Sequence, residues 1–191
     1  MKIDRGHLNE ILETILTVPT APFHEYHVSE TIIRLLASCN SVRIEQDGFG
    51  NIIARYGAGA VEPGWVFGAH MDHPGFVELP DASAYEPNPA RVRDRFTFLG
   101  GVPESYLKKN FPIKEFGRFA MWDLPAFEVR QRKIWSRACD DLVGCATIVA
   151  LLLELDRNGI DYPCAALFTR AEEVGFVGAA TIAKMWPFRS D

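Results

Sequence analysis

Residues 164–178, with the sequence CAALFTRAEEVGFVG, decide the fold that we expect for this chain. They begin with a short apolar run, Cys164 to Thr169, continue with the acidic pair Glu172-Glu173 and lead through glycines into a helical pattern over residues 178–185. A short apolar run that is followed by a turn and a helix is typical of a buried strand in an α/β protein. Open α/β sheets present ligand-binding groups at the carboxyl ends of such strands, so we expect the acidic pair to lie there.

A second apolar run ends in a histidine and an aspartate. Residues 65–69, WVFGA, lie between two Pro-Gly pairs and predict another buried strand. Side chains alternate along a strand, so His70 and Asp72 leave it on the same face. A histidine that binds a metal through one nitrogen commonly donates its other N–H to a carboxylate, and Asp72 is placed for that role. The alternative is a histidine and an aspartate at a strand end without a metal.

A third cluster opens the strongest helical pattern in the chain. Asp140-Asp141 precedes residues 142–155, LVGCATIVALLLEL, which are apolar on nearly all sides and predict a buried helix. A cap at the helix N-terminus accounts for one aspartate. Two adjacent buried carboxylates repel each other unless a cation lies beside them, and a carboxylate that bridges two metals meets that need.

The pair Glu172-Glu173 has two interpretations. On an extended segment neighbouring side chains point in opposite directions, so one glutamate can bind a metal while the other faces a bound water as general base. A solvated acidic turn is the alternative, and it would be favoured if the pair stood alone. All three clusters lie where an apolar run gives way to a turn or a helix, and this shared placement favours a two-metal hydrolase site.

The stretch between the first and second clusters differs from the rest. Residues 74–135 contain prolines at positions 80, 87, 89, 103, 112 and 125 and short aromatic alternations, which predict small twisted strands and many turns. We therefore expect an α/β core, an open mixed sheet flanked by helices, formed by residues 1–73 and 136–191. Residues 74–135 would form a small β-rich insert.

The first third of the chain predicts two helices and a hairpin. Apolar residues repeat at helical spacing over residues 8–16 and again over residues 28–36, in a helix that we expect to begin at Thr20-Ala21-Pro22. Residues 42–45 and 51–56 predict two strands around a glycine-rich turn.

Length and composition argue against several classes of protein. The 191 residues are 48% hydrophobic, which is enough for one α/β core. A net charge of -5 without a basic stripe argues against nucleic-acid binding, and there is neither a long uncharged apolar run nor a polybasic helix for a membrane. We find no signal-peptide pattern and expect a cytoplasmic protein. The four cysteines, Cys39, Cys139, Cys145 and Cys164, adjoin apolar stretches and predict buried thiols instead of disulfides.

Three motifs carry a resemblance to one family. The sequences HMD at residues 70–72, CDDLVG at 139–144 and EEVGFVGA at 172–179, together with DGFGN at 47–51, resemble the tetrahedral or glutamyl aminopeptidases, which have also been labelled cellulase M. Members of that family are exopeptidases with a zinc-exopeptidase-like core. The resemblance implies removal of N-terminal residues from peptide substrates, two divalent metal ions, zinc or cobalt, as cofactors, and a homo-oligomer assembled through the insert.

The resemblance also implies roles for the site residues. His70 would bind one metal, Asp140 would bridge both, and Glu173 would bind the other. Glu172 would be the general base, and Asp72 would orient His70. The family further implies a cis peptide bond after Asp140.

Three features depart from the family pattern. Family members carry two further metal ligands, an acidic residue after the paired glutamates and a histidine near the carboxyl terminus, and we find no counterpart of either before Asp191. The resemblance therefore implies a chain shortened at its carboxyl terminus, with weak metal binding and impaired turnover. Leu142 stands where the family usually has a basic residue, and His73-Pro74 stands where it more often has an acidic and a small apolar residue.

Two further hypotheses remain open. Two-metal carboxypeptidases and deacylases share the order of the clusters but carry their insert after the paired glutamates, whereas here it precedes Asp140. The chain could instead be a non-catalytic remnant that serves as a binding or assembly module, which the small number of metal ligands favours. Glycan hydrolysis has little support, because neighbouring glutamates do not form the facing carboxylate pair of glycosidases.

Overall fold

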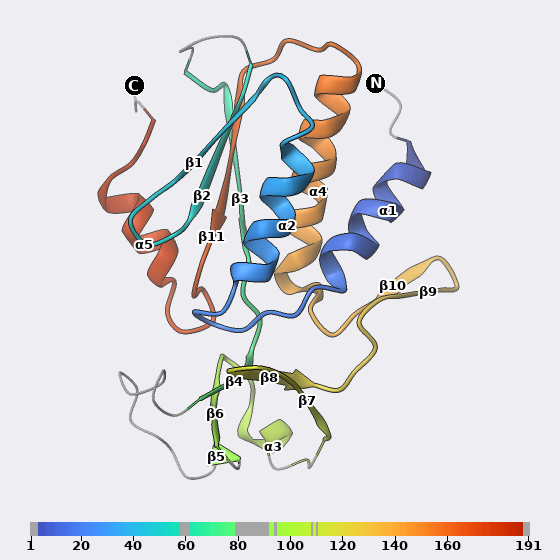
Figure 1. Ribbon diagram of the computed structural model, residues 1–191, viewed down its shortest axis with the longest axis vertical. Helices are drawn as coiled ribbons and strands as arrows, with labels where there is room; N and C mark the ends of the chain where they lie inside the picture. The colour runs from blue at the N-terminus through green and yellow to red at the C-terminus, as the bar shows by residue number, and fades with distance from the viewer. Residues whose placement is uncertain are drawn as a thin grey trace.

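Figure 1 shows a computed structural model of the chain, which describes residues 4–57, 62–78, 92–93, 95–107, 109 and 111–188. Its main sheet has the strand order β1-β2-β11-β3, with β1 at Val42–Gln46, β2 at Ile52–Tyr56, β11 at Cys164–Thr169 and β3 at Trp65–His70. Strand β11 pairs in parallel with β3 and antiparallel with β2, which is in turn antiparallel to β1. The expected open mixed sheet and the expected hairpin are both confirmed.

Helices cover both faces of this sheet (Figure 1). Helices α1 (Arg5–Leu16), α2 (Tyr26–Leu36) and α4 (Cys139–Arg157) lie on one face, and α5 (Val177–Lys184) lies on the other. The expected start of the second helix was wrong, because Thr20–Glu25 form an irregular segment and the helix begins at Tyr26.

The alternation of side chains along the strands divides the apolar core into two layers. Ala54 and Phe168 belong to the large cluster under α1, α2 and α4, whereas Ile53 and Leu167, their neighbours in the sequence, pack with Ile182 of α5. Both faces of the central strands are therefore buried, which explains why residues 164–169 form a nearly continuous apolar run.

The residues between the two halves of the core form a second, antiparallel sheet with the order β5-β6-β4-β8-β7. Its strands are β4 (Gly75–Glu78), β5 (Val92–Arg93), β6 (Phe96–Leu99), β7 (Ile113–Phe116) and β8 (Phe119–Trp122), accompanied by the short helix α3 (Glu104–Leu107). The ribbon of β9 (Glu128–Arg130) and β10 (Lys133–Trp135) then leads to α4. The described residues of this stretch are rich in strands, and the prolines at 80, 87 and 89 lie outside them. A separate insert at residues 74–135 stays a prediction.

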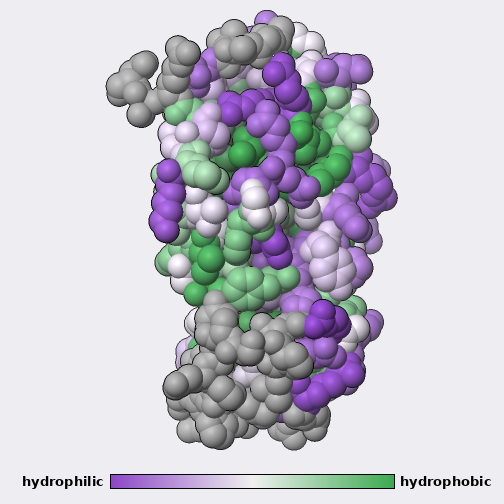
Figure 2. All heavy atoms as spheres, turned by 60° about the vertical axis from the view of Figure 1, so that its left-hand side comes forward, coloured by the Kyte–Doolittle hydropathy of each residue, from purple (hydrophilic) through white to green (hydrophobic). Residues whose placement is uncertain are grey.

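The two sheets are joined through one apolar face. Phe119 and Met121 belong to the same cluster as the main core, whereas Phe76, Phe96 and Phe98 form a separate cluster on the other face of the second sheet. Strand β3 continues almost directly into β4, so the carboxyl end of β3 faces the second sheet (Figure 1). Figure 2, with the α5 side turned forward, shows apolar side chains at the surface among polar ones. None of the described helices is long and apolar enough to cross a membrane.

Candidate metal centre

The three sequence clusters meet at the carboxyl ends of β3 and β11. His70 is the last residue of β3 and pairs in register with Thr169, the last residue of β11. The acidic pair follows β11 by three residues, and Asp140 lies at the first turn of α4. Parallel pairing of β3 with β11 is therefore what brings two of these clusters to one edge of the sheet.

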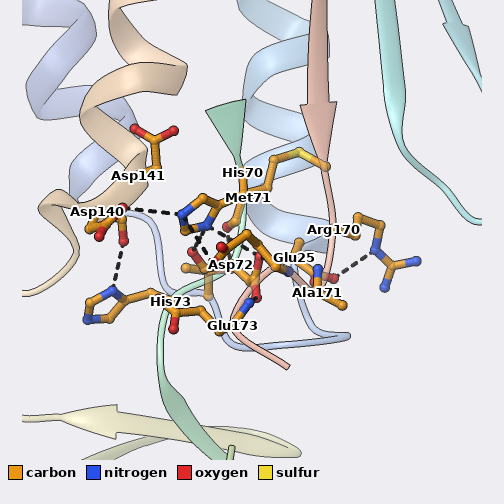
Figure 3. A network of polar contacts seen from close by, with 12 residues as sticks. Glu25, His70, Met71, Asp72, His73, Asp140, Asp141, Arg170, Ala171 and Glu173 are labelled. Carbon is orange, nitrogen blue, oxygen red and sulfur yellow. Dashed lines mark hydrogen bonds and ion pairs between the residues drawn. The ribbon is translucent and has the colours of Figure 1, made fainter. Parts of the chain in front are cut away.

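His70 lies at the centre of the site (Figure 3). Its Nε2 atom is 3.2 Å from Oδ1 of Asp140 and 3.7 Å from Oε2 of Glu172. On the other side of the ring, Nδ1 is 3.1 Å from the main-chain oxygen of Asp72 and 3.5 Å from its carboxylate. The imidazole is thus surrounded by acceptors, and only 12% of the side chain is exposed.

Asp72 is completely buried and does more than face His70. Its two carboxylate oxygens accept hydrogen bonds from the main-chain N–H groups of Glu172 and Glu173, each at 3.0 Å. A buried carboxylate needs such partners, since an unpaired charge in the interior is costly. Asp72 therefore links the end of β3 to the turn that carries the paired glutamates.

The paired glutamates converge, and the expectation that they point in opposite directions was wrong. One ligand atom each of His70, Glu172 and Glu173 lie within 4.8 Å of one another. The expectation assumed an extended segment, but Ala171 has φ 53°, in the left-handed region, and the chain turns there. The turn brings both carboxylates to the same side.

The two aspartates before α4 have different surroundings. The peptide bond between Asp140 and Asp141 is cis, as the resemblance implies. Asp140 reaches His70 with a side chain that is 87% exposed, and its main-chain oxygen accepts a hydrogen bond from Nδ1 of His73 at 2.9 Å. Asp141 instead accepts the N–H of Gly144 at 3.1 Å, as a helix cap does. Asp140 contacts the cluster of His70, Glu172 and Glu173 by way of the His70 ring. The roles of these four residues stay a proposal.

Negative charge dominates the electrostatics of the site. Burial lowers the pKa of His70, but the hydrogen bond and charge of Asp72, together with the charges of Glu172 and Asp141, outweigh burial and raise that pKa to about 9. Burial, with repulsion from Asp72 and Glu172, raises the pKa of Glu173 to about 7. The hydrogen bond from the N–H of Gly101 acts in the opposite direction but is outweighed. The site therefore favours a bound proton or a bound cation.

The DGFGN turn supports the site from the neighbouring hairpin. Oδ1 of Asp47 accepts the N–H groups of Phe49 and Asn51, each at 2.9 Å. The buried amide of Asn51 accepts the N–H of Arg170 at 2.9 Å and donates to the main-chain oxygen of Gly178 at 3.2 Å. This turn thus fixes the chain on both sides of the paired glutamates.

Sequence reasoning missed Glu25 and Arg170, which form an ion pair with Nε and Oε2 2.7 Å apart and with the carboxylate fully buried. The pair lies next to the paired glutamates, because Arg170 precedes Ala171 directly (Figure 3). An arginine just after a buried strand signals that a partner is needed, but its partner lies 145 residues away in the sequence. Spacing could not have identified it.

An open groove extends from the site between β3 and α5. Its lining includes the polar residues His70 and Glu172 and the apolar residues Phe176, Ile182 and Trp186. Polar groups that can hold a cation therefore adjoin an apolar channel, an arrangement common in sites for small molecules and peptides.

The donor atoms fit a divalent metal ion. One imidazole nitrogen and several carboxylate oxygens gather here, and mixed sets of this kind bind zinc and similar ions. The excess negative charge of the site also favours binding of a divalent cation.

Comparison with known proteins identifies the architecture. The structure resembles the TET1 peptidase of Pyrococcus horikoshii (TM-score 0.66, 20% identity, 92% of this chain and 64% of that chain). It also resembles an aminopeptidase from the archaeon Desulfurococcus kamchatkensis (TM-score 0.69, 18% identity, 96% and 61%). A third similar structure is a TET aminopeptidase from a marine sediment archaeon of the Thaumarchaeota (TM-score 0.69, 16% identity, 93% and 62%). The chain thus spans less than two thirds of the length of each of these proteins.

The fold is therefore an α/β core similar to that of the TET aminopeptidases, with a candidate metal centre at its strand ends. In the sequence, residues 112–188 match the model of the M42 glutamyl aminopeptidase family. The expected resemblance is therefore confirmed, over a segment that includes Asp140, Glu172 and Glu173 but not His70 or Asp72. No curated protein has a matching sequence.

Proposed function

We propose that this chain carries the site of a metal-dependent aminopeptidase that removes N-terminal residues from peptides. The observation that carries the proposal is the convergence of His70, Glu172 and Glu173 within 4.8 Å, in a chain whose residues 112–188 match the glutamyl aminopeptidase family. The second sheet, inserted before Asp140, favours this reading over the carboxypeptidase and deacylase type.

The residues proposed to hold two divalent ions, zinc or cobalt, are His70, Asp140 and Glu173. When bound, such ions polarise a carbonyl group and lower the pKa of a water molecule. The contact of Asp140 with His70 supports its inclusion, at 3.2 Å between Oδ1 and Nε2. Three side chains are few for two ions, since zinc usually takes three or four protein ligands. We therefore propose weak binding and slow turnover for this chain.

Glu172 is proposed as the general base. Its carboxylate is partly exposed, lies 3.7 Å from Nε2 of His70 and lines the groove, so it can accept a proton from a molecule held there. The carboxylate of Asp72 positions this base by accepting the main-chain N–H of Glu172. The main-chain oxygen of Asp72 contacts Nδ1 of His70 and so limits the rotation of that ring. A general base at hydrogen-bond reach of its substrate typically contributes about 10²–10⁴-fold to the rate.

The groove is the proposed substrate site. Carboxylates at its inner end suit the ammonium group of a peptide N-terminus, and Phe176, Ile182 and Trp186 suit an apolar side chain. We further propose assembly of several copies, because the similar TET1 peptidase of Pyrococcus horikoshii assembles into a tetrahedron or a large octahedral shell. A reducing compartment such as the cytoplasm fits the four unpaired cysteines.

A binding or assembly module without catalysis is the second candidate. The small ligand set favours it, because the only group of three or more side chains in the described residues that could hold a metal ion is that of His70, Glu172 and Glu173. Such a chain would bind peptide in the groove and release it unchanged.

The test compares the chain with its Glu172→Gln variant, both loaded with zinc or cobalt and assayed on aminoacyl p-nitroanilides and short peptides. We expect slow release of N-terminal residues by the wild-type chain. The variant should lose about 100-fold or more of this rate while retaining its metal content by elemental analysis. Full activity of the variant would contradict the role of Glu172, and peptide binding without hydrolysis by the wild-type chain would favour the module.

A further inference from the structure

The turn that presents the paired glutamates is held by two buried carboxylates. Three successive main-chain N–H groups, those of Ala171, Glu172 and Glu173, each donate to a carboxylate oxygen at 2.9–3.0 Å. Asp72 accepts the second and third, and Glu25 accepts the first. The direction in which this turn leaves β11 therefore depends on both acids.

Glu25 has no part in the proposed chemistry, yet its side chain is completely buried. It stands at the N-cap position of α2, but its carboxylate makes no capping hydrogen bond to that helix. Instead Oε1 accepts the N–H groups of Phe23 and Ala171, both at 2.9 Å, and Oε2 accepts Nε of Arg170 at 2.7 Å. A capping residue would face its own helix, whereas this one faces the site.

The two residues whose N–H groups meet at Oε1 share an unusual backbone conformation. Phe23 has φ 66° and Ala171 has φ 53°, both in the left-handed region that residues with a Cβ atom rarely adopt. Such conformations persist when the surroundings fix them. Here the N–H groups of both residues donate to the same carboxylate oxygen.

Arg170 connects this carboxylate to two further loops. Its guanidinium donates through Nη1 to the main-chain oxygen of Phe49 at 2.7 Å and through Nη2 to that of Phe23 at 3.0 Å. The Glu25-Arg170 pair thus joins the start of α2, the DGFGN turn and the end of β11. The last of these segments leads directly into the turn that carries Glu172 and Glu173.

We propose that Glu25 is a positioning residue of the metal centre, which sets the left-handed turn at Ala171 so that Glu172 and Glu173 converge on His70. The expected effect of Glu25 on metal binding and turnover rests on the proposed function, whereas its expected effect on the conformation of the turn does not. Removal of residues that orient metal ligands typically lowers metal affinity about 10–100-fold.

Glu154 provides a matched control. It is also a buried carboxylate, 4% exposed, and it binds His7, Arg157 and Asn158 toward the carboxyl-terminal end of α4, away from the site. Glu25→Gln and Glu154→Gln therefore remove comparable buried charges, and only the first touches the turn. Glu25→Asp is a milder second variant that keeps the charge but withdraws the oxygen from Ala171.

The experiment measures binding of Co²⁺ and its visible absorption spectrum, together with urea unfolding, on the full chain. We expect Glu25→Gln and Glu25→Asp to bind Co²⁺ about tenfold more weakly with an altered spectrum, and Glu154→Gln to keep the wild-type values. Adding Ala171→Gly to either Glu25 variant should restore part of the affinity, because glycine adopts the left-handed conformation freely.

Three results would overturn the proposal. These are wild-type affinity and spectrum in a folded Glu25 variant, an equal loss in Glu154→Gln, or no recovery with Ala171→Gly. If the wild-type chain binds Co²⁺ but hydrolyses no peptide, the proposed function fails and the metal readout still decides the role of Glu25. If it binds no Co²⁺, amide hydrogen exchange of residues 170–176 decides: faster exchange in Glu25→Gln alone supports the proposal, and unchanged exchange overturns it.

Discussion

Nε2 of His70 and Oδ1 of Asp140 lie 3.2 Å apart, although 70 positions separate the two residues in the sequence. The same ring faces Asp72 and Glu172, so it is a base surrounded by acids. Without a metal, a proton on His70 balances part of this charge. A metal ion that binds His70 must displace that proton, and several measurable properties follow.

Stability of the metal-free chain should depend on pH with a defined sign. The pKa of His70 is raised from 6.5 to about 9 in the folded chain, so its contribution is fully present below pH 6.5 and is lost as the pH rises through 9. The pKa of Glu173 is raised from 4.5 to about 7, and its contribution is lost as the pH rises through 7. We expect the free energy of unfolding to fall between pH 6.5 and 9, with about 3 kcal/mol from His70.

Urea unfolding in EDTA at a series of pH values measures this fall. His70→Gln removes the titrating group and should flatten the curve above pH 7. An unfolding free energy in the wild-type chain that rises over this range would contradict the prediction.

Metal affinity should change with pH in the opposite direction. Since His70 must lose its proton to bind a metal, zinc affinity should rise as the pH approaches 9, and binding near pH 7.5 should release about one proton. Calorimetry in two buffers of different ionisation enthalpy gives the proton count. Binding without proton release would show that His70 is not a ligand.

The substitution Asp72→Asn should weaken the link between β3 and the glutamate turn. One carboxylate oxygen becomes an NH₂ group that cannot accept the N–H of Glu172 or Glu173, which leaves a buried donor unpaired. The expected loss in unfolding free energy is about 1–3 kcal/mol. Asp156→Asn, where a single N–H from Ser41 is accepted at 3.1 Å, is the control and should lose less. Equal losses in urea unfolding would argue against a special role for Asp72.

The substitution Gly178→Ala should disturb the same region from the side of α5. An added Cβ would lie against the main-chain oxygen of Arg170 and 2.5 Å from Oδ1 of Asn51, two groups that the turn needs in place. Overpacking of this kind typically costs about 1–3 kcal/mol. At Gly48 an added Cβ meets nothing within 4 Å, so Gly48→Ala should be nearly neutral in thermal unfolding. A neutral Gly178→Ala would mean that α5 shifts at little cost.

Patterns of apolar residues were sufficient to predict the strands and helices that frame the site. The runs before His70 and before Arg170 form β3 and β11, and residues 142–155 lie within α4, although β3 is only partly buried where a buried strand was expected. Alternation and helical periodicity report burial, and burial of both sheet faces is what organises this core. The parallel pairing of β3 with β11, which brings His70 beside the paired glutamates, could not be predicted from these patterns.

Local rules failed where the chain departs from regular structure. The second helix was expected to begin at Thr20-Ala21-Pro22, but Phe23 adopts a left-handed conformation and Glu25 turns toward Ala171. The same contact explains why Glu172 and Glu173 do not follow the alternation of an extended strand. Both departures involve Glu25, which accepts the N–H of Ala171 from 146 positions away in the sequence, and only the folded structure reveals that contact.

Strand β3 carries His70 at one end. Within the part of the chain that the structure describes, β3 is an edge strand of its sheet. Trp65 at its other end is 61% exposed. An edge strand offers its main-chain donors and acceptors to any extended chain that meets it, including the same strand of another molecule. Concentrated preparations should therefore aggregate through β3, and a charged residue in place of Trp65 should slow that aggregation without touching the metal ligands.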